Sequence, residues 1–157
     1  MSSQKYLHEA LILAKAAALR DEVPVGAVVV FEDQIIAQGS NTREETQDPL
    51  HHAEMLALST ASQKLGSWRL IDCDLYVTLE PCPMCLSACQ QARVRRVIYG
   101  AKDEKGGAIC LGFHVHQHEK LNHQFEVVYE PNEECAQVLK DFFLRRRTEQ
   151  KSAKLKS

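Results

Sequence analysis

The chain has 157 residues, of which 45% are hydrophobic and 25% are charged, and its formal net charge is −2 at pH 7. This is the composition of an ordinary soluble domain that is large enough to bury a core. No apolar run approaches the roughly 20 residues of a membrane-spanning helix, and the polar N-terminal segment is a poor signal peptide. We therefore expect one cytoplasmic domain over residues 1–157.

Helical and extended patterns alternate along the chain. Apolar residues recur at helical spacing in some segments, and short β-branched runs between polar residues indicate strands in others. This alternation predicts an α/β fold in which a mixed five-stranded sheet lies between helices, in three α/β/α layers. In chain order we expect a helix from Ser2 or Ser3, a hairpin of strands 26–31 and 34–37, a polar loop at 41–50, a helix from His52, a strand at 75–79, a helix from Cys82, a strand at 97–100, a glycine-bearing loop at 103–112, a strand at 125–129 and a helix over about 132–150.

His52, Cys82 and Cys85 form the pattern that says most about function. One imidazole and two thiols at positions i and i+3 favour zinc over magnesium or calcium, because nitrogen and sulfur ligands suit zinc. Three protein ligands leave the fourth tetrahedral position for water, as a catalytic zinc site requires. We therefore predict one zinc ion per chain at these residues.

The residues around the two cysteines predict how their sulfurs are presented. Pro81 keeps Glu80 extended, so the preceding segment should remain a strand. Cys82 then falls at a helix N-cap and Pro83 at the first helical position, where its missing N–H costs nothing. The positive end of a helix favours thiolates. Because His52 should open another helix, we expect two helix N-termini to converge on one metal.

Glu54 follows His52 by two residues and predicts the reaction. Its carboxylate could take a proton from water and later give one to a departing amine, so one residue would act as base and then as acid. His-x-Glu followed by Pro-Cys-x-x-Cys is the signature of zinc-dependent nucleobase deaminases. Alone, His52 could be a helix-cap histidine, and the two cysteines could be a redox pair or half of a zinc ribbon. The joint pattern, without a second C-x-x-C, favours a deaminase.

The other cysteines and a histidine series predict no second site. Their spacing fits no disulfide framework, so we expect reduced, buried thiols at Cys73, Cys89, Cys110 and Cys135. His114, His116 and His118 alternate at period two and could form a weak second metal site. An exposed His-rich strand or loop is the better interpretation.

The C-terminal segment is the second informative region. Residues 145–157 contain six basic residues and one acid, Glu149. A basic helix beside Phe142 and Phe143 suits a phosphate backbone with bases stacked alongside. A solvated helix end, whose cations favour the helix dipole, explains the same composition equally well. The two phenylalanines could likewise be core or contact residues.

The whole chain resembles the bacterial tRNA-specific adenosine deaminases, which convert the wobble adenosine of a tRNA anticodon to inosine. This resemblance implies a cytidine-deaminase-like fold, a homodimer, and a tRNA anticodon stem-loop as substrate, usually that of an arginine tRNA. It depends on Glu22–Val28, Asn41, His52–Met55, Trp68–Leu70, Leu75–Cys85, Lys102–Ala108, Asn122-His123 and Glu134–Arg147.

By matching position, the resemblance assigns roles to individual residues. His52, Cys82 and Cys85 would hold zinc, and Glu54 would shuttle protons. Asp103 would meet the nucleotide near its ribose, where a carboxylate can accept a hydrogen bond from the 2′-OH. The full set of expected substrate contacts is Val25, Gly26, Ala27, Asn41, Ala53, Asp103, Phe142, Phe143 and Arg146.

Two alternatives remain open at this point. A guanine deaminase resembles the chain around Cys82–Cys85, but it acts on a free base and has no need of a basic C-terminal helix. A zinc-stabilised RNA-binding module without catalysis is opposed by Glu54, because structure alone does not require that carboxylate. One departure from the family is Ile109–Leu111, where smaller residues are usual. We expect this loop to approach the substrate, so its larger residues could alter packing or nucleotide fit.

Overall fold

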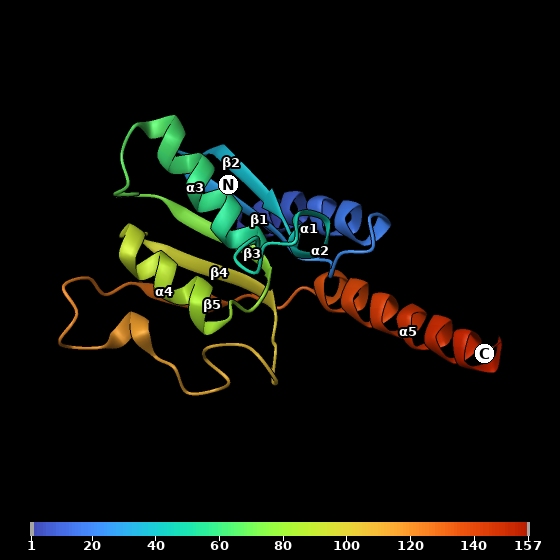
Figure 1. Ribbon diagram of the computed structural model, residues 1–157. Helices are drawn as coiled ribbons and strands as arrows, with labels where there is room; N and C mark the ends of the chain where they lie inside the picture. The colour runs from blue at the N-terminus through green and yellow to red at the C-terminus, as the bar shows by residue number, and fades with distance from the viewer. Residues whose placement is uncertain (1, 157) are drawn as a thin grey trace.

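A mixed sheet with helices on both faces forms the framework of the protein (Figure 1), and the computed structural model describes residues 2–156. Within these residues the sheet has five strands in the order β2-β1-β3-β4-β5. The strands are β1 (Gly26–Phe31), β2 (Gln34–Ser40), β3 (Asp74–Leu79), β4 (Arg96–Ala101) and β5 (Glu126–Tyr129). The helices are α1 (Ser3–Leu19), α2 (Arg43–Thr46), α3 (Ala53–Leu65), α4 (Pro83–Ala92) and α5 (Glu133–Lys156), and η1 (Val115–Gln117) is a 3₁₀ turn.

Strand direction follows from the connections. β1 and β2 are joined by a two-residue turn, Glu32-Asp33, in which both residues have positive φ, and they pair antiparallel. β3, β4 and β5 are parallel, and α4 supplies the crossover between the first two. Residues that follow β3 and β4 therefore emerge at the same edge of the sheet, where ligands bind in open α/β sheets.

The central strands β1, β3 and β4 are buried on both faces of the sheet, so three layers form. Along β1, Ala27 and Val29 pack with the cluster that includes α3 and α4, whereas Val28 and Val30 pack with α1. This alternation is the period-two geometry of a strand. Figure 1 shows α3 and α4 on one face, with α1 and α5 on the other. The predicted α/β/α arrangement is confirmed.

Gly26 marks the closest approach of α1 to the sheet. A Cβ at this position would lie 2.0 Å from Ala10 O and 2.8 Å from Ala14 N, both backbone atoms. We expect Gly26→Ala to lower the free energy of unfolding by about 1–3 kcal/mol or more, because backbone atoms of the helix must shift. Chemical denaturation measures this. Gly66→Ala is the control for backbone strain without a steric clash, since φ is +64° and no atom lies within 4 Å. It should cost about 1 kcal/mol, and Gly26→Ala should cost more. An equal loss in both variants would contradict the steric argument.

Two helices differ from their predicted extents. The segment 41–50, predicted as a loop, contains the four-residue helix α2. The last helix continues to Lys156 instead of ending near Gln150, because the residues beyond include strong helix formers and neither glycine nor proline. Ser2 occupies the N-cap of α1 as predicted, but its side chain makes no capping hydrogen bond.

Two predictions of exposure were wrong. Cys110 is exposed in the loop after β4, where its thiol donates a hydrogen bond to Glu80. His116 is buried because it lies in η1, with its ring edge against Phe125, whereas His114 and His118 are exposed as predicted. All six cysteines are free. Within residues 2–156, no helix combines the length and hydropathy that crossing a membrane requires.

Candidate active site

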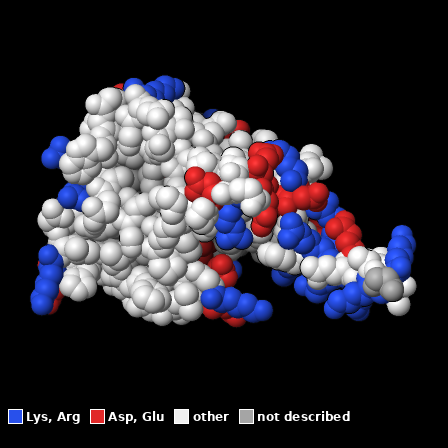
Figure 2. Space-filling model, in the orientation of Figure 1, with Lys and Arg blue, Asp and Glu red and all other residues white. Residues whose placement is uncertain are grey.

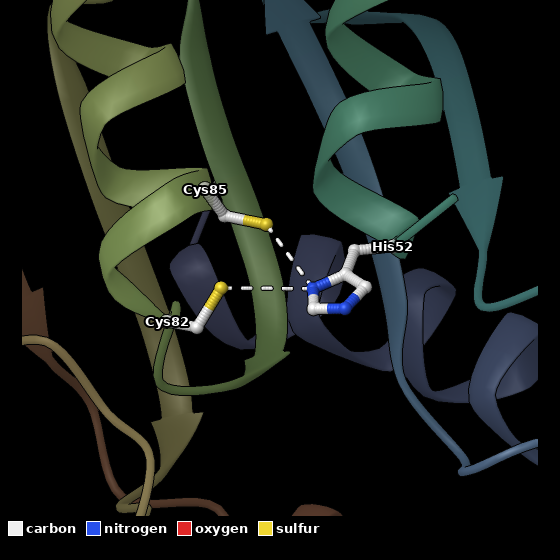
Figure 3. A group of neighbouring side chains, drawn as sticks. All are labelled: His52, Cys82 and Cys85. Carbon is white, nitrogen blue, oxygen red and sulfur yellow. Dashed lines mark hydrogen bonds between the residues drawn. The ribbon is translucent and has the colours of Figure 1, made fainter. Parts of the chain in front are cut away.

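His52, Cys82 and Cys85 come together at two helix N-termini (Figure 3). His52 is the N-cap of α3, and Cys82 is the N-cap of α4, with Pro83 at the first helical position. His52 Nδ1 lies 3.6 Å from Cys82 Sγ and 3.5 Å from Cys85 Sγ. The predicted convergence of two helix ends is therefore observed.

These separations fit a tetrahedral zinc ion. Zn–S bonds of about 2.3 Å and Zn–N bonds of about 2.0 Å, at a tetrahedral angle, place nitrogen and sulfur roughly 3.5 Å apart. All ligand atoms of the three residues lie within 4.8 Å of one another. Among residues 2–156, this is the one group of at least three such side chains close enough to hold a metal. The donor set of one nitrogen and two sulfurs selects zinc, as the sequence predicts.

The two thiols interact with each other and with His52. A hydrogen bond from Cys85, together with His52, lowers the pKa of the Cys82 thiol to about 4, although burial opposes the shift. The same hydrogen bond and burial raise the pKa of Cys85. A thiolate is the form of cysteine that ligates metal, so the site already stabilises one ligand in its binding form.

Glu54 lies in the first turn of α3 and is 4% exposed. Burial raises the pKa of its carboxyl to about 7, with backbone hydrogen bonding opposing the shift. A carboxyl with this pKa both accepts and gives up a proton near neutral pH. Its position in the first turn of α3, two residues after the ligand His52, suits the proton transfer that the sequence predicts.

A small cavity of about 140 Å³ opens beside the ligands. This volume is below the roughly 300–1,000 Å³ of pockets for drug-sized ligands, so it suits one flat ring rather than a complete nucleotide. Seven of the residues predicted from the sequence line it, and Val23, Arg43, Leu79 and Glu80 line it in addition. The seven are Val25, Asn41, His52, Ala53, Glu54, Cys82 and Asp103.

Gly26 and Ala27, also expected at the substrate, lie further along β1. Ala27 is fully buried in the core, and Gly26 faces α1 while its N–H donates to Thr78 Oγ1. Of these three neighbouring residues, Val25 lines the cavity, whereas Gly26 and Ala27 do not.

Glu80 anchors the loop that carries Asp103. Its carboxylate accepts hydrogen bonds from the N–H of Asp103 at 3.3 Å and from the N–H of Cys110 at 3.0 Å. Glu80 is 2% exposed and lines the cavity, so Cys110 contacts a residue of the cavity wall, whereas residues 109–111 do not line the cavity themselves. For Glu80 the sequence predicts only an extended backbone, because this residue precedes Pro81.

Comparisons with known proteins give a consistent result. A model of the family described as MafB19-like deaminase matches residues 1–147. The tRNA-specific adenosine deaminase of Bacillus subtilis is 46% identical over 150 residues, which are 95% of this chain and 93% of that protein. The protein of the same name from Aquifex aeolicus is 43% identical over 143 residues, 91% of this chain and 95% of its own length. This chain belongs to the tRNA-specific adenosine deaminase family.

Solved structures place this deaminase among the same proteins. A structure from a study of A-to-I editing by tRNA:A34 deaminases superposes with a TM-score of 0.82 and 40% identity, covering 87% of this chain and 99% of that one. The guanine deaminase of Bacillus subtilis gives a TM-score of 0.64 and 39% identity, covering 72% of this chain and 71% of that one. The family and the fold class that the sequence predicts are both confirmed.

A second, larger cavity of about 630 Å³ adjoins the first in this deaminase. Val23, Leu79 and Asp103 line both cavities, so the two lie side by side. The second is bounded by basic side chains, by Phe143 and by the loop after β4. Its remaining lining residues are Lys102, Lys105, Gly106, Leu139, Phe143 and Arg147.

Helical periodicity separates the roles of the aromatic and basic residues of α5. Phe143 and Arg147 are four residues apart and reach the second cavity together. Phe142 and Arg146 share the face that packs on α1: Phe142 is 3% exposed, and Arg146 donates to Asp21 O at 2.9 Å while lying 5.0 Å from the Phe142 ring centre. Phe142 and Arg146 thus lie where α5 docks, and Arg147, rather than Arg146, lines the second cavity beside Phe143.

Proposed function

We propose that this protein hydrolyses adenosine to inosine at the wobble position of a tRNA anticodon. The observation that carries the proposal is the convergence of three zinc-ligand side chains and the buried Glu54 carboxyl at one small cavity. Identity of 46% to the Bacillus subtilis tRNA-specific adenosine deaminase, along nearly the whole chain, supports the same substrate. An arginine tRNA is our expectation within that class.

Glu54 moves the protons of this reaction. Its carboxylate takes one proton from the attacking water and delivers it to the ring nitrogen N1. It then takes the second proton from the hydroxyl formed on C6 and delivers it to the amine as the C6–N bond breaks. The oxygen of water remains on C6 as a carbonyl and ammonia leaves, so the atoms balance. Zinc held by His52, Cys82 and Cys85 supplies the Lewis acidity that makes water nucleophilic near neutral pH.

Other cavity residues orient the nucleotide. The Asn41 amide offers both a donor and an acceptor to the edge of the base, and Val25 and Ala53 bound the base on its apolar sides. Asp103 Oδ1 accepts hydrogen bonds from Lys105 N and Gly106 N, which fixes the carboxylate at the rim. Its other oxygen would accept from the ribose 2′-OH, the group that distinguishes RNA from DNA.

The second cavity would hold the nucleotides that flank the target adenosine. Lys102, Lys105 and Arg147 offer cations to phosphates, and Phe143 is 42% exposed and free to stack on a base. A loop nucleotide is already poorly stacked, so turning its base into the small cavity costs less than extracting a base from a duplex. Cations continue along the projecting end of α5, as Figure 2 shows.

We expect truncation after Arg147 to weaken binding of a tRNA anticodon stem-loop several-fold at low salt. The truncation removes Lys151, Lys154 and Lys156 but retains the arginines that dock α5 on α1. For every phosphate that these lysines neutralise, the truncation should reduce the slope of log K against log salt by about 0.7–0.9. Binding titrations across a salt series measure this, with lysine-to-arginine substitution at the three positions as the control. Unchanged affinity at every salt concentration would identify the segment as a solvated helix end.

We also propose a homodimer formed through the face that carries α3 and α4. Figure 2 shows few charged side chains over this part of the molecule. A groove between the two helices is lined by Met55, Leu58, Trp68 and Ala88, and Trp68 is 54% exposed. Sedimentation would test the assembly, and Trp68→Glu should shift it toward monomer. The cytoplasm is the proposed compartment, in keeping with six free cysteines.

Guanine deamination is the second candidate, because the Bacillus subtilis guanine deaminase shares 39% identity with the chain. One experiment separates the two functions. Purified protein is incubated with free guanine, with cytidine, and with a tRNA that carries a wobble adenosine, and ammonia and inosine are measured. Inosine in tRNA alone supports the proposal. Ammonia from guanine with no change to tRNA replaces it with the alternative.

A further inference from the structure

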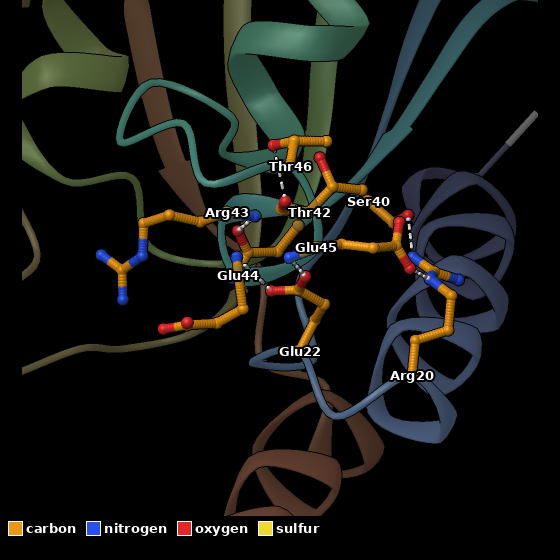
Figure 4. A network of polar contacts seen from close by, with 9 residues as sticks. Arg20, Glu22, Ser40, Thr42, Arg43, Glu44, Glu45 and Thr46 are labelled. Carbon is orange, nitrogen blue, oxygen red and sulfur yellow. Dashed lines mark hydrogen bonds and ion pairs between the residues drawn. The ribbon is translucent and has the colours of Figure 1, made fainter.

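Glu22 is a buried carboxylate that lies outside both the metal set and the cavity. It sits between α1 and β1 and is 1% exposed. Its Oε1 accepts a hydrogen bond from Glu44 N at 3.1 Å, and its Oε2 accepts one from Glu45 N at 2.7 Å (Figure 4). Burying an ionisable group is costly, so a buried carboxylate that accepts two hydrogen bonds from another segment indicates a structural or functional role.

The two amides are the second and third of helix α2. In most helices a side chain at the N-cap satisfies these donors, but the N-cap Thr42 makes no side-chain capping bond. Four residues are too few to form a stable helix alone, because nucleation is costly. Glu22 therefore acts as the cap from a distant part of the chain, and its negative charge suits the positive end of α2.

This contact joins two segments that form one wall of the small cavity. Val23 and Val25 follow Glu22 directly, and Asn41 and Arg43 lie immediately before the amides that Glu22 holds. The other bonds between the segments are longer: Asn41 N to Val25 O is 3.2 Å, and Asn41 Nδ2 to Val23 O is 3.4 Å.

The remaining link at this position lies at the surface. Arg20 contacts Glu45 at 3.2 Å and Ser40 at 2.9 Å, with partly exposed side chains that contribute little. The two charge-assisted hydrogen bonds of Glu22 are buried, and they are therefore the strongest of the contacts that join the two segments.

We propose that Glu22 is a positioning residue that fixes Asn41 at the cavity and thereby sets the affinity for the nucleotide. Glu22 does not touch the substrate, and it acts through Asn41. The inference rests on the proposed deaminase function.

Glu54 and the zinc ligands are positioned by α3 and α4 and by the N-caps of these helices, and not by the contact of Glu22 with the two amides, which we call the Glu22 clamp. Helix α2 adjoins this group at His51, whose O accepts a hydrogen bond from Thr42 N at 3.1 Å and whose Nδ1 lies 2.7 Å from Thr46 Oγ1. We therefore expect the clamp to affect binding more than chemistry, and zinc content is measured together with KM.

The first test is a kinetic comparison of Glu22→Gln with the unchanged holoenzyme on a tRNA anticodon stem-loop. The Gln amide keeps the shape, but its NH₂ must face one of the two N–H donors, so one bond is lost. We expect KM to rise about tenfold, with kcat changed less than about twofold and zinc content unchanged. Glu44→Gln is the matched control, since Glu22 contacts only the backbone of Glu44, and it should leave KM as it is.

A double-mutant cycle shows whether the effect passes through Asn41. In an Asn41→Ala background, Glu22→Gln should change KM by less than about twofold. Additive effects of the two substitutions would overturn the proposal, as would a fall in kcat with KM unchanged. If Glu22→Gln does not fold, Glu22→Asp carries the same comparison, because it keeps the charge but shortens the reach to the two amides.

Amide hydrogen exchange gives a readout that needs no activity. Glu22→Gln should accelerate exchange at residues 43–46 and leave α3 and α4 protected as before. Unchanged exchange at residues 43–46 would refute the proposal that Glu22 caps and holds α2, even if the protein deaminates tRNA. Conversely, a wild-type protein that ignores tRNA refutes the proposed function, and accelerated exchange would still establish the clamp.

Discussion

Glu54→Gln is expected to lose most turnover while zinc content and tRNA affinity stay near those of the unchanged protein. The amide has the size of the carboxyl but cannot accept the proton of the attacking water. A general acid–base group typically contributes about 10²–10⁴-fold, and Glu54 acts as base and as acid in the same cycle. Its burial leaves little room for bulk water to replace it. Single-turnover kinetics with saturating enzyme measure the chemical step separately from binding.

Two controls test whether the loss of turnover is due to the Glu54 carboxylate. Glu44→Gln makes the same chemical change at an exposed position and should retain turnover. Metal analysis of Glu54→Gln should show the zinc content of the wild type, because Glu54 is not one of the ligands that converge on His52. A single-turnover rate within a few-fold of wild type would show that another group carries the protons.

The metal set could be predicted from sequence because each ligand is placed by its local sequence, and because the joint His-x-Glu and Pro-Cys-x-x-Cys signature pairs the two distant segments. Pro81, Cys82 and Pro83 define a strand end and a helix start within three residues, and the structure has both at those positions. The position of His52 is likewise defined locally, because it is the N-cap of α3. The strands could also be predicted, because the period of two of a half-buried strand is visible in consecutive residues.

The parts that sequence reasoning missed depend on contacts between distant segments. Helix α2 was predicted as loop because Glu22, which caps it, precedes its amides by more than twenty residues. Glu80 was overlooked because its partners lie in a loop that follows the next strand. Arg147 was different: its spacing of four from Phe143 was available in the sequence, and it identifies the cavity-facing side of α5 once helical periodicity is applied.

Removal of either zinc thiolate is expected to have the largest effect on the folded state. Cys82→Ser and Cys85→Ser should lose stoichiometric zinc, because the serine hydroxyl is a poor ligand near neutral pH. Zinc binding also contributes to folding, since the metal binds the assembled site and not the unfolded chain. Both variants should therefore melt at lower temperature than the holoenzyme. Metal analysis and thermal unfolding with and without a chelator measure the two effects.

Cys89→Ser provides the matched control for that experiment. Cys89 lies on the same helix one turn after Cys85 and is equally buried, but it is not part of the ligand group. Burying its hydroxyl should cost about 1–3 kcal/mol while zinc remains stoichiometric. Chelator should then lower the melting temperature of the wild type and of Cys89→Ser, yet leave Cys85→Ser unchanged. Stoichiometric zinc in both Cys82→Ser and Cys85→Ser would refute the ligand assignment, since two of the three converging side chains would have proved dispensable.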